Sequence, residues 1–269
     1  MPKQRLDVIL VERGLFESRN KAAAAVLAGD VQLARGGRRV EKPGQMFDED
    51  VELLVAERER YVSRGGIKLE NAFKAFTEID PAGRKALDAG ASTGGFTDYL
   101  LQNGAAHVIA ADVAYGELHM KLRGDNRVTV IERKNVRELV PGELEYEPDL
   151  LVADLSFIAV AKVLPALLPL MAERFDAVVL VKPQFEVGRE RVGKGGVVRD
   201  PDVRVDAVVE AGEAAAAAGY SVLGVCSSGL PGPAGNLEWF LWLAELGREG
   251  AIDLAELRAA AQAIEQQRR

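Results

Sequence analysis

The stretch that decides the fold runs from Leu87 to Asp112 and reads LDAGASTGGFTDYLLQNGAAHVIAAD. An apolar segment leads into a glycine-rich turn, which is followed by an amphipathic segment, a second apolar segment and an aspartate. This order is typical of a strand, a helix and a parallel strand in a Rossmann-like sheet, with a ligand-binding turn after the first strand. The glycines are spaced G-x-x-x-G-G, which differs from the dinucleotide pattern G-x-G-x-x-G and favours S-adenosylmethionine over NAD.

The turn and the strand ends around it supply the expected cofactor site. Glycines let a ligand approach the backbone closely, and the first amides of the helix suit an anionic group. Asp112 can accept both hydroxyl protons of a ribose. We expect the cofactor to be held by Gly90, Ser92, Thr93, Gly94, Gly95, Phe96, Thr97, Asp112, Asn135 and Asp154.

Two other interpretations of this turn stay open at this point. Residues 90–94 also fit the nucleophile elbow G-x-S-x-G of hydrolases, with Ser92 as the nucleophile. A hydrolase needs an acid and then a histidine well downstream, but the only histidines are His107 and His119, both in the next unit. The second alternative is a glycine-rich turn that binds no ligand.

Composition narrows the class of protein. The chain has 269 residues, 48% of them hydrophobic, and a net charge of −7. Residues 1–42 hold nine Lys or Arg and five Asp or Glu, a net charge of +4, so the rest carries −11. A basic end on an acidic body suggests a module that binds a polyanion. With one cysteine and two histidines no zinc site is expected, and because no signal peptide or membrane span is evident we expect a cytoplasmic protein.

The basic segment has the pattern of a small α+β module. Helices are expected at residues 5–14 and 19–27, strands at 31–34 and 51–55, and a hairpin turn at 35–38. Its candidate RNA-binding cations are Arg5, Arg19, Lys21, Arg35, Arg38, Arg39 and Lys42. The segment resembles the S4-type RNA-binding domain in RLD at 5–7, SR at 18–19 and KPG at 42–44. That resemblance implies binding to structured RNA by shape and backbone.

The remainder of the chain alternates strands and helices. Strands are expected at 128–132, 150–153, 177–181, 220–227 and 236–243, and helices at 64–78, 160–171, 202–218 and 253–267. The apolar strands indicate a parallel sheet covered on both faces. The last two strands lack a helix between them, so we expect the final strand to be antiparallel, as in methyltransferase sheets.

Four ionisable residues are expected to converge at the edge of this sheet. Asp154 and Lys182 follow strands, Glu238 lies at the same edge if its strand is antiparallel, and Lys68 comes from the preceding helix. A lysine held there by carboxylates can accept or guide the proton of an alcohol. Taken singly, Lys182 could equally be a salt-bridged residue at a strand end, and Asp154 could equally be a helix cap.

The order Lys68, Asp154, Lys182, Glu238 matches the tetrad of Rossmann-like ribose 2′-O-methyltransferases. Together with SRGG at 63–66, DAGASTGGFTD, VADLSFI, VKPQFEVG and LPGPAGN, it makes nearly the whole chain similar to the TlyA (haemolysin A) family. Thr93 stands where many of the wider group have proline. The resemblance implies an S4-like domain at 1–58, a linker at 59–63 and an S-adenosylmethionine-dependent methyltransferase domain at 64–269.

The resemblance also implies 2′-O-methylation of a cytidine in ribosomal RNA, with ribosomal RNA or subunits as the partner. We expect Arg64 and Arg189 to add RNA contacts, the latter in a loop, residues 188–196, that also carries Arg191 and Lys194. We expect neither a metal ion nor a membrane to take part. We expect the protein to be a monomer or a weak dimer. The alternatives are a non-enzymatic RNA-binding or ribosome-assembly factor and a membrane-lysing protein.

Overall fold

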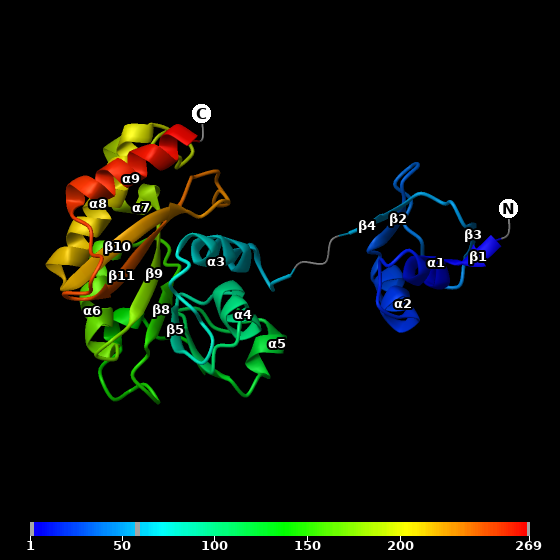
Figure 1. The fold of residues 1–269 in the computed structure, drawn as a ribbon, viewed down its shortest axis with the longest axis horizontal. Coiled ribbons are helices and arrows are strands. Elements are labelled where there is room, and N and C mark those ends of the chain that lie inside the picture. Colours follow the sequence, from blue (N-terminus) through cyan, green and yellow to red (C-terminus); the bar gives the residue numbers. More distant parts are fainter. Residues whose placement is uncertain (1–2, 57–59, 268–269) are drawn as a thin grey trace. The chain divides into compact units, whose positions relative to one another are not determined.

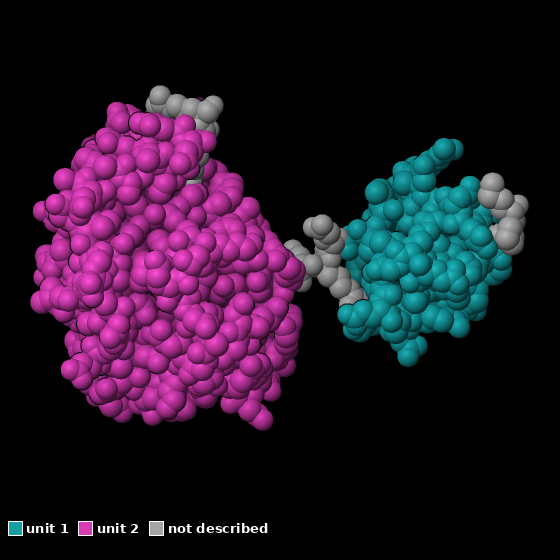
Figure 2. Space-filling model, viewed as in Figure 1, with its two compact units in different colours: residues 1–59 teal, residues 60–269 magenta. Residues whose placement is uncertain are grey.

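The computed structural model describes residues 3–56 and 60–267. The chain divides into two compact units, Met1–Glu59 and Arg60–Arg269 (Figure 2). The expected linker at 59–63 starts at Glu59, which lies outside the described residues. Residues 60–63 belong to the second unit, where the buried ring of Tyr61 lies 5.7 Å from that of Tyr99.

The first unit consists of two helices and two short strand pairs. Its elements are β1 (Lys3–Arg5), α1 (Leu6–Glu12), α2 (Arg19–Ala28), β2 (Val31–Leu33), β3 (Met46–Asp48) and β4 (Leu53–Val55). β1 pairs with β3 and β2 with β4, both antiparallel. Ser18 caps α2 by accepting the amide of Lys21, and Gly29 ends that helix with φ +83°. The strands β1 and β3 were not expected, because three residues are too few to show alternation.

The second unit is built on a seven-stranded sheet in the order β10-β11-β9-β8-β5-β6-β7. The strands are β5 (Lys85–Ala89), β6 (His107–Ala111), β7 (Val128–Ile131), β8 (Leu150–Ala153), β9 (Asp176–Val181), β10 (Tyr220–Ser227) and β11 (Trp239–Glu245). β5 to β9 are mutually parallel, and β11 runs antiparallel to both of its neighbours. The Rossmann-like sheet with an antiparallel last strand is therefore confirmed.

Helices cover both faces of this sheet (Figure 1). They are α3 (Arg64–Ala75), α4 (Gly95–Gln102), α5 (Met120–Arg123), α6 (Leu164–Leu167), α7 (Pro183–Glu186), α8 (Pro201–Ala217) and α9 (Leu254–Gln267). Short 3-10 turns are η1 (Val136–Glu138), η2 (Val160–Lys162), η3 (Leu168–Leu170) and η4 (Arg189–Arg191). In the described residues, no helix has the length and apolar character needed to cross a membrane.

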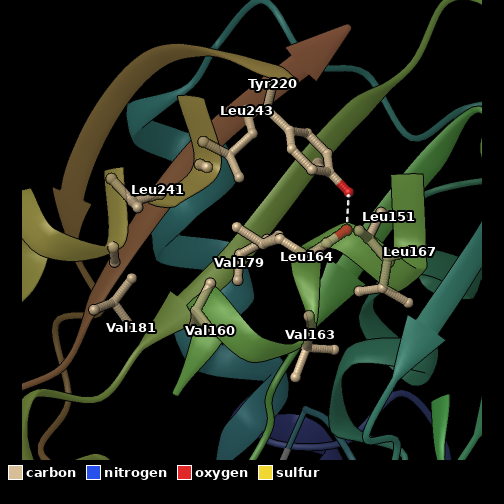
Figure 3. Close-up of a cluster of buried hydrophobic side chains, with 14 of the residues drawn as sticks. Leu151, Val160, Val163, Leu164, Leu167, Val179, Val181, Tyr220, Leu241 and Leu243 are labelled. Atoms are coloured by element: carbon tan, nitrogen blue, oxygen red, sulfur yellow. Dashed lines mark hydrogen bonds between the residues drawn. The ribbon is translucent and has the colours of Figure 1, made fainter. Parts of the chain in front are cut away.

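Alternate residues of each strand enter opposite layers, as the pleat requires. Leu151 and Val179 face the layer of α6, α8 and α9, whereas Val152 and Val178 face that of α3 and α4. In the first layer the Tyr220 hydroxyl donates to the carbonyl of Leu164 at 2.9 Å, which satisfies a polar group inside the core (Figure 3). Both faces of the parallel strands are thus buried.

Three expected elements differ from the structure by more than two residues at an end or along their length. Residues 160–171 form η2, α6 and η3 instead of one helix, because Pro165 and Pro169 have no N–H to donate and restrict the residues before them. α3 stops at Ala75, since Phe76 leaves the helix and packs 5.6 Å from Trp242. β11 starts at Trp239, three residues later than expected.

Candidate active site

A cavity of about 370 Å³ opens at the carboxyl ends of the central strands. β5 lies between β6 and β8, so the connections that leave β5 and β7 pass to opposite sides and create a crevice there. Of the expected cofactor residues, the cavity is lined by Gly90, Ser92, Asp112, Asn135 and Asp154. Its size lies within the range of small-molecule sites.

The glycines of the turn are required by packing within the protein. Gly90 has φ +87°, and a Cβ there would lie 2.6 Å from the carbonyl oxygen of Asp154. A Cβ at Gly94, where φ is +96°, would collide with Leu122, and one at Gly95 would collide with Ser63. Gly94 and Gly95 therefore also let neighbouring segments of the protein meet, a requirement that the sequence pattern alone did not indicate.

Asp112 is held firmly in the wall of the cavity. Its Oδ2 accepts the Ser92 amide at 2.7 Å, and its Oδ1 accepts the Ala114 amide at 2.8 Å. Ser92 has φ +47°, an unfavourable backbone region for serine, and the bond to Asp112 holds it there. Each carboxylate oxygen keeps a lone pair, so Asp112 can still accept hydroxyl protons from a ribose.

Two of the expected cofactor residues point into the protein. The ring of Phe96 lies 5.9 Å from that of Phe240, and Thr97 donates to Asp88 Oδ2 from its amide at 3.0 Å and its hydroxyl at 2.6 Å. Only their backbone could meet a ligand. Burial raises the pKa of the Asp88 carboxyl to about 7, although the hydrogen bonds from Thr97 oppose that rise. Asp88 was not among the expected site residues; its signal in the sequence is an acid inside an apolar strand.

The four expected catalytic residues form two lysine–carboxylate pairs. Lys68 on α3 donates to Glu238 at 2.5 Å, and both side chains are buried. Lys182 lies 2.6 Å from Asp154 Oδ1 and donates to the Ser156 hydroxyl at 2.8 Å. Ser156 was not among the expected residues. These contacts fix the direction in which each amine points.

Strand register explains why these residues meet at one edge. Trp239 lies opposite Val181 in the antiparallel pair β11–β9, so Glu238 and Lys182 leave their strands side by side. In the parallel pair β8–β9, Ala153 lies opposite Val179, which places Asp154 beside the end of β9. Both pairs therefore stand at the carboxyl ends of the parallel strands, where Asp154 lines the cofactor cavity.

A second hollow, which we call the groove, has a volume of about 940 Å³. It shares Phe157 and Ile158 with the cofactor cavity, and three cations line it: Arg137, Lys162 and Arg189. Phe157 is 90% exposed, and its ring lies 5.3 Å from that of Phe185. The groove therefore combines an exposed ring with positive charge, the two features that suit a nucleotide chain.

Three other charged groups, one lining the groove and two outside it, have protein partners. Burial raises the pKa of Glu186, which lines the groove, to about 7, although the amide of Val160 donates to it. Arg191 from the same loop binds Glu210 of α8 at 2.8 Å, so its charge is already engaged. Arg64 donates to the carbonyl of Pro231 at 2.7 Å while remaining exposed.

The cations of the first unit fall into two sets. Arg5 and Arg19 both bind the buried Asp7, and the hydrogen bond from Arg5 is the main reason why the pKa of that carboxyl falls to about 2. Lys21 pairs with Glu17, and Arg35 lies 3.7 Å from Glu52. Within residues 3–56 and 60–267 no ion pair is formed by the second set, which is Arg38, Arg39 and Lys42.

Residues 61–245 match the family of FtsJ-like methyltransferases, and the chain belongs to that family. It is therefore a methyltransferase, and S-adenosylmethionine is its cofactor, as the sequence predicted. The hydrolase interpretation is wrong. Within the described residues no cluster of three or more His, Cys, Asp or Glu could hold a metal ion.

The chain is 51% identical to the 16S/23S rRNA (cytidine-2′-O)-methyltransferase TlyA of Mycobacterium tuberculosis over 90% of both chains. It is 39% identical to hemolysin A of Brachyspira hyodysenteriae, over 87% of this chain and 97% of the relative. A solved structure described as a candidate hemolysin from Streptococcus thermophilus superposes with a TM-score of 0.73 at 38% identity, covering 99% of this chain and 97% of that one. The predicted membership of the TlyA family is confirmed.

Proposed function

We propose that this chain transfers a methyl group from S-adenosylmethionine to the 2′-oxygen of a cytidine ribose in ribosomal RNA. The observation that carries the proposal is the pair of lysine–carboxylate contacts at the carboxyl ends of the strands, Lys68–Glu238 and Lys182–Asp154, of which Asp154 lines the cavity. A ribose hydroxyl is a weak nucleophile, so a site that methylates it must orient the oxygen and take up its proton. The reaction named for the relative from Mycobacterium tuberculosis supports the same substrate.

Each group at the site has a separate task in this proposal. When bound, S-adenosylmethionine supplies an electrophilic methyl group; Asp112 and the Ser92 turn hold its adenosine end. Lys182 orients the 2′-hydroxyl and guides its proton, while Asp154 and Ser156 hold the amine. Positioning can contribute up to about 7–11 kcal/mol, and proton transfer roughly a hundredfold to ten-thousandfold in rate.

The first unit has the task of RNA attachment. Arg38, Arg39 and Lys42 lie around the glycine turn at 35–38 without an ion-pair partner in the described part of the chain, so they are the cations best able to contact phosphates. Arg189 and Lys162 extend the positive surface along the groove of the second unit. We propose ribosomal subunits in the cytoplasm as the partner, and a monomer or weak dimer as the working form, with no metal in the reaction.

The decisive experiment is single-turnover methyl transfer to unmodified ribosomal subunits with saturating cofactor. Lys182→Ala should abolish transfer while cofactor binding persists, and Lys182→Arg should also be poor because a guanidinium does not give up its proton. Lys85→Ala is the matched control, since Lys85 begins β5 at the amino end of the parallel strands, away from the site. Near-normal transfer by Lys182→Ala would remove the lysine from the mechanism. RNA binding without transfer by the wild-type chain would indicate an assembly factor instead.

A further inference from the structure

One wall of the groove is a segment with little regular structure. We call residues 193–199 the strap; it joins η4 to α8, and its Gly193 and Gly196 line the groove. Val198, also in the strap, packs against Val187 and Ala207 in a small apolar cluster. Because the strap belongs to no helix or strand, its backbone groups must find other hydrogen-bond partners.

Asn236 supplies two of those partners. It is 2% exposed; its Oδ1 accepts the amide of Val198 at 2.9 Å, and its Nδ2 donates to the carbonyl of Gly196 at 2.8 Å. The carbonyl of Val198 accepts from Arg204 of α8 at 3.2 Å. Both backbone groups of Val198 are thus held by side chains, the amide by Asn236 and the carbonyl by Arg204.

The same asparagine belongs to the loop that carries Glu238. Its carbonyl accepts the amide of Gly232 at 2.8 Å and closes the turn. Gly232 has no room for a side chain, because a Cβ would collide with the carboxylate of Glu238. Two residues after Asn236, Glu238 binds Lys68. Asn236 therefore joins the wall of the groove to one of the two lysine–carboxylate pairs.

We propose that Asn236 is a positioning residue that fixes the strap relative to Glu238 and so sets how the RNA approaches the reacting centre. The inference rests on the proposed function, because it assigns the groove to the RNA substrate. Asn236 lines neither the cofactor cavity nor the groove, so it acts through Gly196 and Glu238. Arg204 also anchors the strap, through the carbonyls of Val198 and Arg199, and binds Glu265 of α9 through two hydrogen bonds. The strap should therefore loosen, while the unit stays folded, when Asn236 is removed.

The test compares Asn236→Ala with Asn103→Ala, whose side chain bonds one carbonyl at the far end of α4. Misplacement by about 1 Å can cost a hundredfold in rate. We expect Asn236→Ala to lower kcat/KM for ribosomal subunits roughly tenfold to a hundredfold, with a raised KM for RNA and cofactor affinity within about twofold of wild type. Asn236→Asp, which has no donor for Gly196 and places a buried carboxylate against that carbonyl, should lose at least as much as Asn236→Ala.

A second measurement does not depend on turnover. Arg189, Arg191, Lys194 and Arg199 are trypsin sites in or next to the strap. Trypsin should cut Asn236→Ala there faster than it cuts wild type or Asn103→Ala. Unchanged cleavage together with normal kcat/KM, or equal losses of cofactor and RNA affinity, would overturn the proposal. A wild-type chain without transfer would contradict the proposed function alone, because the cleavage rates still decide whether Asn236 holds the strap.

Discussion

Breaking the buried pair Lys68–Glu238 should destabilise the second unit strongly. The exposed fraction of the side chain is 9% for Lys68 and 2% for Glu238, so neither charge can turn to water when its partner is lost. Removal of one member of such a pair costs about 3–5 kcal/mol, whereas replacing both by apolar groups of similar size is often neutral. We expect Glu238→Leu and Lys68→Met each to cost about 3–5 kcal/mol in free energy of unfolding, and the double variant to recover most of it.

Urea unfolding followed by tryptophan fluorescence is the assay. The only two tryptophans of the chain, Trp239 and Trp242, lie on β11, so the signal reports on the second unit. The pair Lys182–Asp154 provides the comparison, because the Asp154 side chain is 26% exposed and keeps contact with water. Lys182→Met should therefore cost less, about 1–2 kcal/mol, although it also abolishes transfer. A loss below about 1 kcal/mol for Glu238→Leu, or strictly additive losses in the double variant, would refute the reasoning.

Three further predictions concern the cofactor, the RNA and pH. Asp112→Ala should weaken S-adenosylmethionine binding by calorimetry, because it removes the acceptor in the cavity and releases Ser92; normal affinity would contradict this role. Replacing Arg38, Arg39 and Lys42 with alanine should flatten the salt dependence of binding to ribosomal subunits without changing cofactor affinity, and an unaltered slope would exclude them as phosphate contacts. Asp88 has a pKa of about 7 in the folded chain against an ordinary 3.8, so the folded state holds its proton more tightly. The free energy of unfolding should therefore fall by at most roughly 4 kcal/mol as the pH rises from about 4 to 7. In thermal melting experiments Asp88→Asn should not show this decrease.

The sequence was enough to predict which polar residues lie at the ends of the strands. The segment Leu87–Asp112 shows its strand, turn and helix locally, because periodicity and glycine spacing act within a few residues. The same reasoning placed Asp154 and Lys182 after strands. The order of the elements also predicted an antiparallel last strand. Because such a strand begins beside the carboxyl ends of its parallel neighbours, Glu238 was expected at the same edge.

The partner of each side chain was decided by the tertiary structure. Lys68 and Glu238 are 170 residues apart, and no local pattern pairs them with each other rather than with Asp154 or Lys182. Asp7 engages Arg5 and Arg19, although composition makes every cation of the first unit look equally available.

The turn glycines show the same division between sequence and structure. Sequence spacing marked Gly94 as a necessary glycine, but only the packed structure shows that Leu122 occupies the place of its side chain. Hydrogen bonds such as those of Asn236 to the strap join segments about 40 residues apart. Such contacts depend on how whole elements pack. The sequence by itself therefore determined the class of site, and only the folded chain decided which of the expected residues contact one another.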